Sequence, residues 1–418
     1  MNTHEKDLFS RQIGAVGKQT MEKMMNLNVL VIGCNSISME CIKCLSLLGI
    51  NTLYIYDNTK YSNKNADQFY TTGIKGSKLS NLLMEFAKTL NSSFRVEIVN
   101  SVADLLVKTN KIHCIIQTKP ELYNIKNLEK YCIENNIKFI FCSNHELYGY
   151  IFSNFGSHLV VDQDGETCES GFLENVNYND KTIELIVEKL NKNLISSKGI
   201  LVNKDNERIE VCIKSSTLEK IIVEKTEEIE KYIKNKNKNI KFVEIKSEMK
   251  VAHKNMEKII NEGSYQYITV DSTFDKPSNN ELYNQYTKFL LDLSIKNYSN
   301  EKFTRDNGFF ILGSIIGGIV AHEVIKVTGK YTPINQDIMF DFSKFKGKDL
   351  YKSGSNRNAS LIDRTVLKNI KSLDIFMVGC GALGCELSKN LGMIDACSMS
   401  NSMLTITDMD TIELSNLN

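Results

Sequence analysis

A glycine-rich turn near the end of the sequence constrains the fold more than any other feature. The run Ile375–Val378 is short and apolar without helical period, and it leads into Gly379, Gly381 and Gly384, which fit G-x-G-x-x-G. A helix-like segment follows at once. Strand, glycine turn and helix in this order are typical of a nucleotide-binding unit. Glycines let the backbone approach a phosphate without a Cβ atom in the way, and the N–H groups that begin a helix favour an anion.

An acidic residue farther along adds weight to the turn, because a glycine pattern alone is weak evidence. A second apolar strand, Leu404–Thr407, leaves Asp408 at its carboxyl end, where a carboxylate can accept hydrogen bonds from a ribose. Asp410 follows two residues later, and capping of the next turn explains it at least as well as metal binding does. The sequence therefore predicts a nucleotide site at Gly379–Gly384 and Asp408.

The same plan occurs once more near the start of the chain, so the sequence contains an internal repeat. An apolar strand begins at Val29, a turn and a helix pattern follow, and a second strand ends at Asp57. Here Gly33, Asn35 and Ser38 stand where the later copy has three glycines. Because two side chains now occupy positions of close backbone approach, we expect the early copy to keep the fold without binding a nucleotide.

The rest of the chain indicates an α/β protein. Helix-like and strand-like runs alternate through residues 75–142, which predicts a doubly wound, mostly parallel Rossmann-like sheet. From about 165 to 250 short strand candidates are separated by polar pieces, which predicts a small inserted domain. Residues 280–299 and 308–328 are expected to be helices, and the second is apolar nearly all round, as a buried helix would be.

Composition excludes several classes of function. The 418 residues contain 51 Lys and Arg against 50 Asp and Glu, and this balance favours neither nucleic acid nor an anionic membrane as a partner. No apolar run reaches the ~18 residues of a membrane span. The eleven scattered cysteines and an N-terminus without a signal-peptide pattern predict a reduced protein of the cytoplasm and nucleus. No metal site is predicted, because neither the C-x-x-C of Cys41 and Cys44 nor His322-Glu323 has zinc-ligand spacing.

Several segments taken together resemble the N-terminal half of the ubiquitin-activating enzyme (E1) family. They are Ser10-Arg11-Gln12, the early repeat, Ile316–Val324, Tyr331–Ile334, Val378–Glu386 and Thr407–Asn418. The resemblance implies a ThiF/MoeB-type adenylation fold divided in the order that follows. Residues 1–164 would begin an inactive adenylation domain, 165–255 would be a divergent first catalytic-cysteine half-domain, 256–307 a helical bundle, 308–350 the end of the inactive domain, and 351–418 the start of the active one.

The resemblance also assigns roles to single residues. Gly379, Gly381, Ala382 and Gly384 would line an ATP pocket, Asp408 would hold the ribose hydroxyls, and Asn416 would lie near the phosphates. Arg11, which by itself is most simply a solvated surface charge, would reach the phosphates from the inactive half. An arginine there can neutralise charge that develops on pyrophosphate.

The implied activity is adenylation of the C-terminus of ubiquitin or a ubiquitin-like protein, with ATP and Mg²⁺ as cofactors. A thioester with a cysteine and transfer to E2 conjugating enzymes would follow. The nucleophilic cysteine and the E2-binding part would lie beyond residue 418, so we expect this chain to be part of a longer enzyme and inactive alone.

Two other functions fit parts of the pattern. An NAD-dependent oxidoreductase would also combine the glycine turn with Asp408, but Asp408-Met-Asp410 and Ser415–Asn418 have no place in the usual dinucleotide fingerprint. The scaffold half of a two-chain E1-like activator would carry one adenylation-like unit. Here a second unit with intact glycines begins in the same chain, which favours the fused enzyme.

Overall fold

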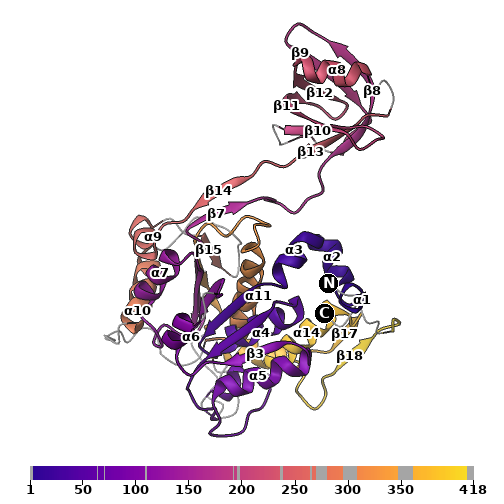
Figure 1. The fold of residues 1–418 in the computed structure, drawn as a ribbon. Coiled ribbons are helices and arrows are strands. Elements are labelled where there is room, and N and C mark those ends of the chain that lie inside the picture. The colour runs from indigo at the N-terminus through magenta and orange to yellow at the C-terminus, as the bar shows by residue number, and fades with distance from the viewer. Residues whose placement is uncertain are drawn as a thin grey trace. The chain divides into compact units, whose positions relative to one another are not determined.

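The computed structural model describes residues 3–63, 65–69, 71–108, 111–191, 193–194, 198–235, 239–263, 266–269, 280–294, 308–346 and 361–411 (Figure 1). The chain divides into two compact units. The large unit comprises Met1–His158, Val251–Thr328 and Pro333–Asn418, and the small unit comprises Leu159–Lys250 and Gly329–Thr332. The functional division of the chain into five domains remains a prediction.

An eight-stranded sheet forms the centre of the large unit, in the order β15-β16-β6-β5-β4-β1-β2-β3. Strands β1 to β5 run parallel, and β6 is antiparallel to both β5 and β16. The bounds are β1 Asn28–Ile32, β2 Thr52–Tyr56, β3 Arg95–Ile98, β4 Cys114–Gln117, β5 Lys138–His145, β6 Tyr148–Asn154, β15 Gln266–Thr269 and β16 Asp337–Asp341. The predicted Rossmann-like α/β fold is confirmed, and its order 3-2-1-4-5 around β1 is the doubly wound arrangement.

Helices bury this sheet on both faces, which explains why its strands are continuous apolar runs. Leu30 and Ile32 of β1 belong to a core shared with α7, α9 and α10, whereas Val29 and Val31 point the other way and are also fully buried. The helices are α1 Thr3–Leu8, α2 Ser10–Val16, α3 Lys18–Met24, α4 Ser36–Leu48, α5 Leu79–Leu90, α6 Val102–Lys108, α7 Ile125–Glu134, α9 Met256–Glu262, α10 Asn280–Ser294 and α11 Phe310–Lys326.

Helix α11 packs closely on α4, as its small residues predict. A Cβ atom on Gly317 would lie 2.5 Å from the carbonyl oxygen of Ile37, and one on Gly313 would lie 2.2 Å from Oγ of Ser36. Twelve of its residues are buried. Close approach of the two backbones therefore depends on glycine at these positions.

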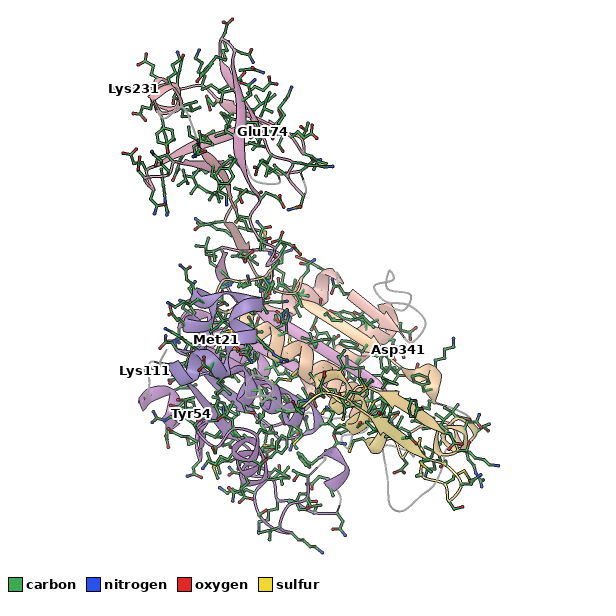
Figure 2. All side chains as sticks on the ribbon, turned by 90° about the vertical axis from the view of Figure 1, so that its right-hand side faces the viewer. Met21, Tyr54, Lys111, Glu174, Lys231 and Asp341 are labelled. Carbon is green, nitrogen blue, oxygen red and sulfur yellow. The ribbon has the colours of Figure 1, made fainter. Side chains whose placement is uncertain are left out.

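The small unit is a closed barrel with strand order β10-β11-β12-β9-β8-β13. Its strands are β8 Ser170–Tyr178, β9 Thr182–Val187, β10 Lys198–Val202, β11 Arg208–Ser216, β12 Lys220–Glu224 and β13 Lys241–Ile245, with helix α8 at Glu227–Asn235. Alternate residues such as Leu185, Val223 and Phe242 fill the interior together with Ile229 of α8. Lys231 of α8 and Glu174 of β8, which are labelled in Figure 2, are exposed on the surface of this unit.

Two further strands, β7 Ser157–Val160 and β14 Met249–Ala252, pair in a separate two-stranded sheet. The second copy of the repeat follows near the end of the chain. It contains α13 Arg364–Lys371, β17 Ile375–Val378, α14 Ala382–Met393 and β18 Leu404–Thr407, and β17 pairs with β18 in parallel. Among the described residues, no helix is long and apolar enough to cross a membrane.

Candidate nucleotide-binding site

The glycine turn of the second copy joins β17 to the start of α14. The N–H of Gly379 donates to the carbonyl of Thr407 at 2.8 Å, which extends the pairing of β17 with β18, and Gly379 then takes a φ of +96° that favours glycine. Gly381 is the N-cap of α14, and no side chain of the described residues caps this helix. The first N–H groups of α14 are therefore open to an anion.

The three glycines of the turn have different reasons to be glycine. A Cβ atom on Gly384 would lie 2.3 Å from the carbonyl oxygen of Gly379, so Gly384 allows α14 to pack against the end of β17. Cβ atoms on Gly379 and Gly381 would meet nothing within 4 Å. The space beside these two glycines is what a phosphate group would need, and Ala382 begins the helix at its edge.

Asp408 closes the site from the end of β18. Its carboxylate accepts hydrogen bonds from the backbone N–H groups of Cys380 and, at 2.9 Å, of Asp410. The N–H of Asp410 and then that of Cys380 lower the pKa of Asp408, so the exposed side chain is ionised at neutral pH. An ionised carboxylate held by the turn can accept hydrogen bonds from the hydroxyls of a ribose.

The first copy has the same framework. Gly33 donates to Tyr56 at 2.9 Å, Cys34 donates to the carboxylate of Asp57 at 2.8 Å, and φ at Gly33 is +105°. Each contact has its counterpart at Gly379, Cys380 and Asp408 of the second copy. The duplication inferred from the sequence is therefore repeated in the hydrogen bonding.

The groups that a nucleotide would use are occupied in the first copy. The side chain of Asn35 accepts from the N–H groups of Ile37 and Ser38 at 3.1 Å, and Ser38 returns the contact in a capping box. The side chain of Asp57 is buried, and its carboxylate accepts a hydrogen bond from Nζ of Lys119 at 2.7 Å. The adjoining cavity of about 190 Å³ is smaller than the roughly 300–1,000 Å³ typical of small-molecule sites.

Four charged side chains connect α4 of the first copy to α14 of the second. Lys43 contacts Glu40 at 2.6 Å and also Glu386, while Lys389 contacts Glu386 at 2.7 Å and also Glu40. When the two glycine turns are aligned, Glu386 and Lys389 stand at the positions of Glu40 and Lys43. The network is thus related to itself by the repeat, as in a contact between two equivalent subunits. Glu40, Lys43 and Lys389 are largely buried in it.

The structure brings together most of the predicted site residues. Gly379, Gly381, Ala382, Gly384 and Asp408 surround one turn, whereas Asn416 lies outside the described residues. Arg11 is exposed on α2, which is tied to the end of α4 by the bond from Nε2 of Gln12 to the carbonyl of Leu47 at 3.1 Å. The roles of all these residues remain predictions.

Sequence reasoning missed Lys119 and the four-charge network. Lys119 follows β4 at the carboxyl edge of the sheet. A lysine at this edge of the copy expected to bind no nucleotide was the signal that could have predicted its pairing with Asp57. The network was visible as Glu-x-x-Lys in equivalent places on two helices.

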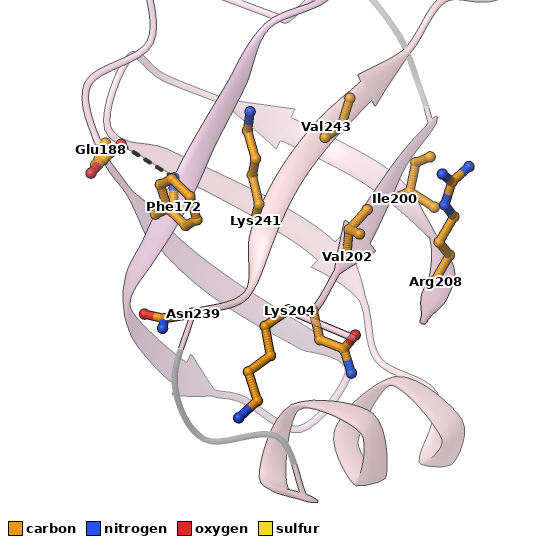
Figure 3. Close-up of a pocket in the computed structure, with 10 residues that line it drawn as sticks. Phe172, Glu188, Ile200, Val202, Lys204, Arg208, Asn239, Lys241 and Val243 are labelled. Carbon is orange, nitrogen blue, oxygen red and sulfur yellow. Dashed lines mark hydrogen bonds between the residues drawn. The ribbon is translucent and has the colours of Figure 1, made fainter. Parts of the chain in front are cut away.

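The small unit has a separate groove of about 900 Å³ on the outside of its barrel (Figure 3). Ile200, Val202 and Val243 form an apolar floor, and Lys241 lies 5.9 Å above the centre of the Phe172 ring. Among the described residues that line this groove, none belongs to the glycine turn or to the other predicted site residues.

Comparison with known proteins agrees with the duplicated fold. The model of the ThiF family matches residues 9–354 and again residues 353–418. A ubiquitin-like modifier-activating enzyme 1 from Dictyostelium discoideum is 27% identical over 98% of this chain and 45% of its own length. A ubiquitin-activating enzyme E1 1 from Schizosaccharomyces pombe is 24% identical over 100% of the chain and 46% of its own length. A human ubiquitin-like modifier-activating enzyme 6 is 26% identical over 98% and 44%.

This chain spans about half the length of these relatives. The matches run along essentially all of it, and they confirm the resemblance to the ubiquitin-activating enzyme family that the motifs indicate. Because one family model matches the chain twice and one hydrogen-bonded turn occurs in two copies, the chain belongs to the ThiF family of adenylation folds and, within it, to the ubiquitin-activating enzyme family.

Proposed function

We propose that this chain is the N-terminal part of an E1 enzyme and that its second copy binds ATP. The observation that carries the proposal is the contrast between the two turns. The helix start is capped by Asn35 and the acid is paired with Lys119 in the first copy. In the second copy the helix start has no side-chain cap, and Asp408 is exposed.

The residues of the second copy suit the parts of an adenosine nucleotide. The N–H groups at the start of α14 would bind phosphate oxygens, and Asp408 would accept from the ribose hydroxyls. Arg11 and Asn416 would add contacts to the phosphates. Mg²⁺, when bound, supplies further neutralisation of phosphate charge.

The proposed reaction is attack by the C-terminal carboxylate of ubiquitin or a ubiquitin-like protein on the α-phosphorus of ATP. An acyl adenylate forms and pyrophosphate leaves. A positive charge from Arg11 near the leaving phosphates would stabilise the transition state. In the longer protein the acyl group would pass to a cysteine as a thioester and from there to an E2 conjugating enzyme. We propose the cytoplasm and nucleus as its location.

A nucleotide titration tests the central step. We expect isothermal titration calorimetry to detect binding of ATP to the chain and no comparable binding of NADH. Asp408→Ala should abolish the ATP signal, whereas Asp180→Ala, an exposed acid of the small unit, should leave it unchanged. Tight binding of NADH would instead support the dinucleotide oxidoreductase.

The scaffold alternative is tested by catalysis. The chain alone should not support ATP–pyrophosphate exchange in the presence of ubiquitin, because it covers only 45% of the length of the Dictyostelium relative and we expect further residues of the active adenylation half to be needed. A longer protein that carries the rest should support exchange, and Arg11→Ala should reduce its rate. Exchange by the chain alone at a rate that depends on Arg11 would refute this division of roles.

A further inference from the structure

Two cysteines flank the start of α14 in positions that bring their side chains together. Gly381 is the N-cap, so Cys380 is the residue before it and Cys385 is the fourth residue of the helix. Side chains at these two positions meet in the arrangement known as the hydrophobic staple. In this chain both members of the staple are thiols.

The structure records direct contact between them. The Sγ atom of Cys385 donates to the carbonyl of Cys380 at 3.3 Å. Desolvation and then a hydrogen bond with the Cys385 thiol raise the pKa of Cys380. Cys385 is exposed and Cys380 partly exposed, so the pair is accessible to a small oxidant, unlike the fully buried Cys41, Cys114 and Cys142.

The first copy offers an internal contrast. Its staple positions hold Cys34 and Met39, and both side chains are buried. A thioether cannot form a disulfide, so at these two positions the described part of the second copy carries a thiol pair and the first copy does not. The thiol pair therefore coincides with the proposed nucleotide site.

We propose that Cys380 and Cys385 form a reversible disulfide on exposure to a hydroperoxide and that this disulfide weakens ATP binding. The proposal rests on the proposed function for its second half. With hydrogen peroxide as the oxidant, the thiolate of Cys385 attacks one peroxide oxygen, the oxygen–oxygen bond breaks, and the sulfur becomes a sulfenic acid. The departing hydroxide takes up a proton and leaves as water; an organic hydroperoxide would leave as its alcohol. The Cys380 thiol then attacks the sulfenic sulfur, a second water leaves, and the sulfur–sulfur bond forms. Two electrons pass from sulfur to peroxide, and a thiol reductant reverses the step.

The bond would change the turn that carries the proposed ligands. Gly381 and Gly384 lie between the two cysteines, and the N–H of Cys380 orients Asp408. Joining the sulfur atoms at ~2.05 Å requires the contact of Sγ with the carbonyl of Cys380 to be given up. The turn then moves, and with it both the helix start and the hydrogen bond to Asp408.

Peptide mass spectrometry of the native chain tests the disulfide. Lys371 and Lys389 bound one tryptic peptide that contains both cysteines. After treatment with hydrogen peroxide and alkylation, this peptide should lack both alkyl groups, and dithiothreitol should restore them. Cys385→Ser should prevent the cross-link, whereas Cys212→Ser, at an exposed cysteine of the barrel, should not. Absence of the cross-link in the folded wild-type chain would overturn the proposal.

Calorimetry with ATP on the oxidised and reduced chain tests the consequence. Oxidation should weaken ATP binding by about tenfold or more, and dithiothreitol should reverse the loss. In Cys385→Ser, the ratio of oxidised to reduced affinity should be close to one. If the cross-link forms and ATP binds equally well, the regulatory half is refuted. If the reduced wild-type chain binds no ATP, the proposed function and the regulatory half both fail, while the mass measurement still decides whether the pair is redox-active.

Discussion

Gly384→Ala should disturb the nucleotide turn from within, because the new methyl group has no room. A Cβ atom at this position would lie 2.3 Å from the carbonyl oxygen of Gly379, and ordinary contacts of this kind begin near 3.4 Å. The oxygen that the new methyl group would meet belongs to the backbone of Gly379, so it cannot move aside by a side-chain rotation. Separating α14 from the end of β17 by about an ångström should cost ~2 kcal/mol, as overpacking does. If this cost falls on the conformation that binds ATP, affinity should fall about thirtyfold.

Gly392→Ala is the matched control in the same helix. A Cβ atom on Gly392 would meet nothing within 4 Å. Because alanine loses less conformational entropy than glycine in a helix, this change should stabilise α14 by about 0.5–1 kcal/mol. The same substitution at two positions eight residues apart in one helix should therefore change its stability in opposite directions.

Hydrogen exchange and calorimetry can measure the two effects. Gly384→Ala should speed amide exchange at the start of α14 and weaken ATP binding, while Gly392→Ala should slow exchange in the helix and leave ATP binding unchanged. Exchange at β1 to β5 serves as the internal reference, since neither substitution touches that sheet. Wild-type affinity in Gly384→Ala would refute the argument from close packing, and equal losses in both variants would mean that any added methyl group disturbs this helix.

Three further predictions follow from other contacts. In the longer enzyme, Asp408→Ala should abolish adenylate formation in an exchange assay, whereas Asn35→Gly should change it little, because glycine also serves as an N-cap at a cost of a few tenths of a kcal/mol. Lys389→Met should destabilise the packing of α14 and lower the free energy of unfolding, measured by chemical denaturation, by about 1 kcal/mol; the effect is small because Glu386 is nearly half exposed. An unchanged free energy of unfolding would contradict a stabilising role for the network. Burial raises the pKa of Asp337 to about 7, so its contribution to the free energy of unfolding is complete below about pH 4 and is lost as the pH rises through 7. In thermal melts between these pH values, Asp337→Asn should reduce the dependence of the melting temperature on pH. An unaltered pH dependence would contradict this assignment.

The sequence predicted the sheet of the large unit well because its strands are buried on both faces. In runs such as Val29–Ile32 and Cys114–Gln117 the first three residues are apolar and buried, and glycine or polar turns follow the runs. The sequence pattern predicts strands at Gln336–Asp341 and Tyr148–Phe152; in the structure β16 begins one residue later and β6 ends two residues later. These are shifts at the ends of elements, where hydrogen bonding and periodicity carry the least information.

The barrel was harder to predict because one face of each strand is exposed to solvent. The sequence pattern predicts strands at Gly199–Val202, Glu210–Ile213 and Ile240–Ile245, which correspond to β10, β11 and β13, but it does not predict β8, β9 and β12. Strand β8 contains the polar residues Glu174, Asn175 and Asn177. A nine-residue strand with a bulge between Leu173 and Asn175 breaks the period of two on which the prediction depends. Closure of the barrel stabilises these strands through pairing that no local pattern records.

The candidate site divides in the same way. The backbone parts of the site were predictable, since glycine spacing and an acid after the second strand follow from local geometry. Lys119 was not, because its partner Asp57 lies 62 residues away and meets it only through the order of the strands. The pairing of Cys380 with Cys385 is local, yet in the sequence alone both cysteines are most simply interpreted as small apolar packing residues. The structure shows instead that Cys385 is exposed.

The four-charge network explains how a copy without a nucleotide site can still serve one that has it. The first copy has filled its own helix start with Asn35 and neutralised Asp57, so its turn gains stability from contacts within the chain. Its helix α4 nevertheless presents Glu40 and Lys43 to the equivalent pair on α14. Each lysine contacts both glutamates, so the ion pair within each helix is joined to the ion pair of the other helix by two further contacts. The first copy thereby fixes the position of the helix whose N-terminus forms the proposed ATP site, and α2 with Arg11 is anchored to the far end of the same α4.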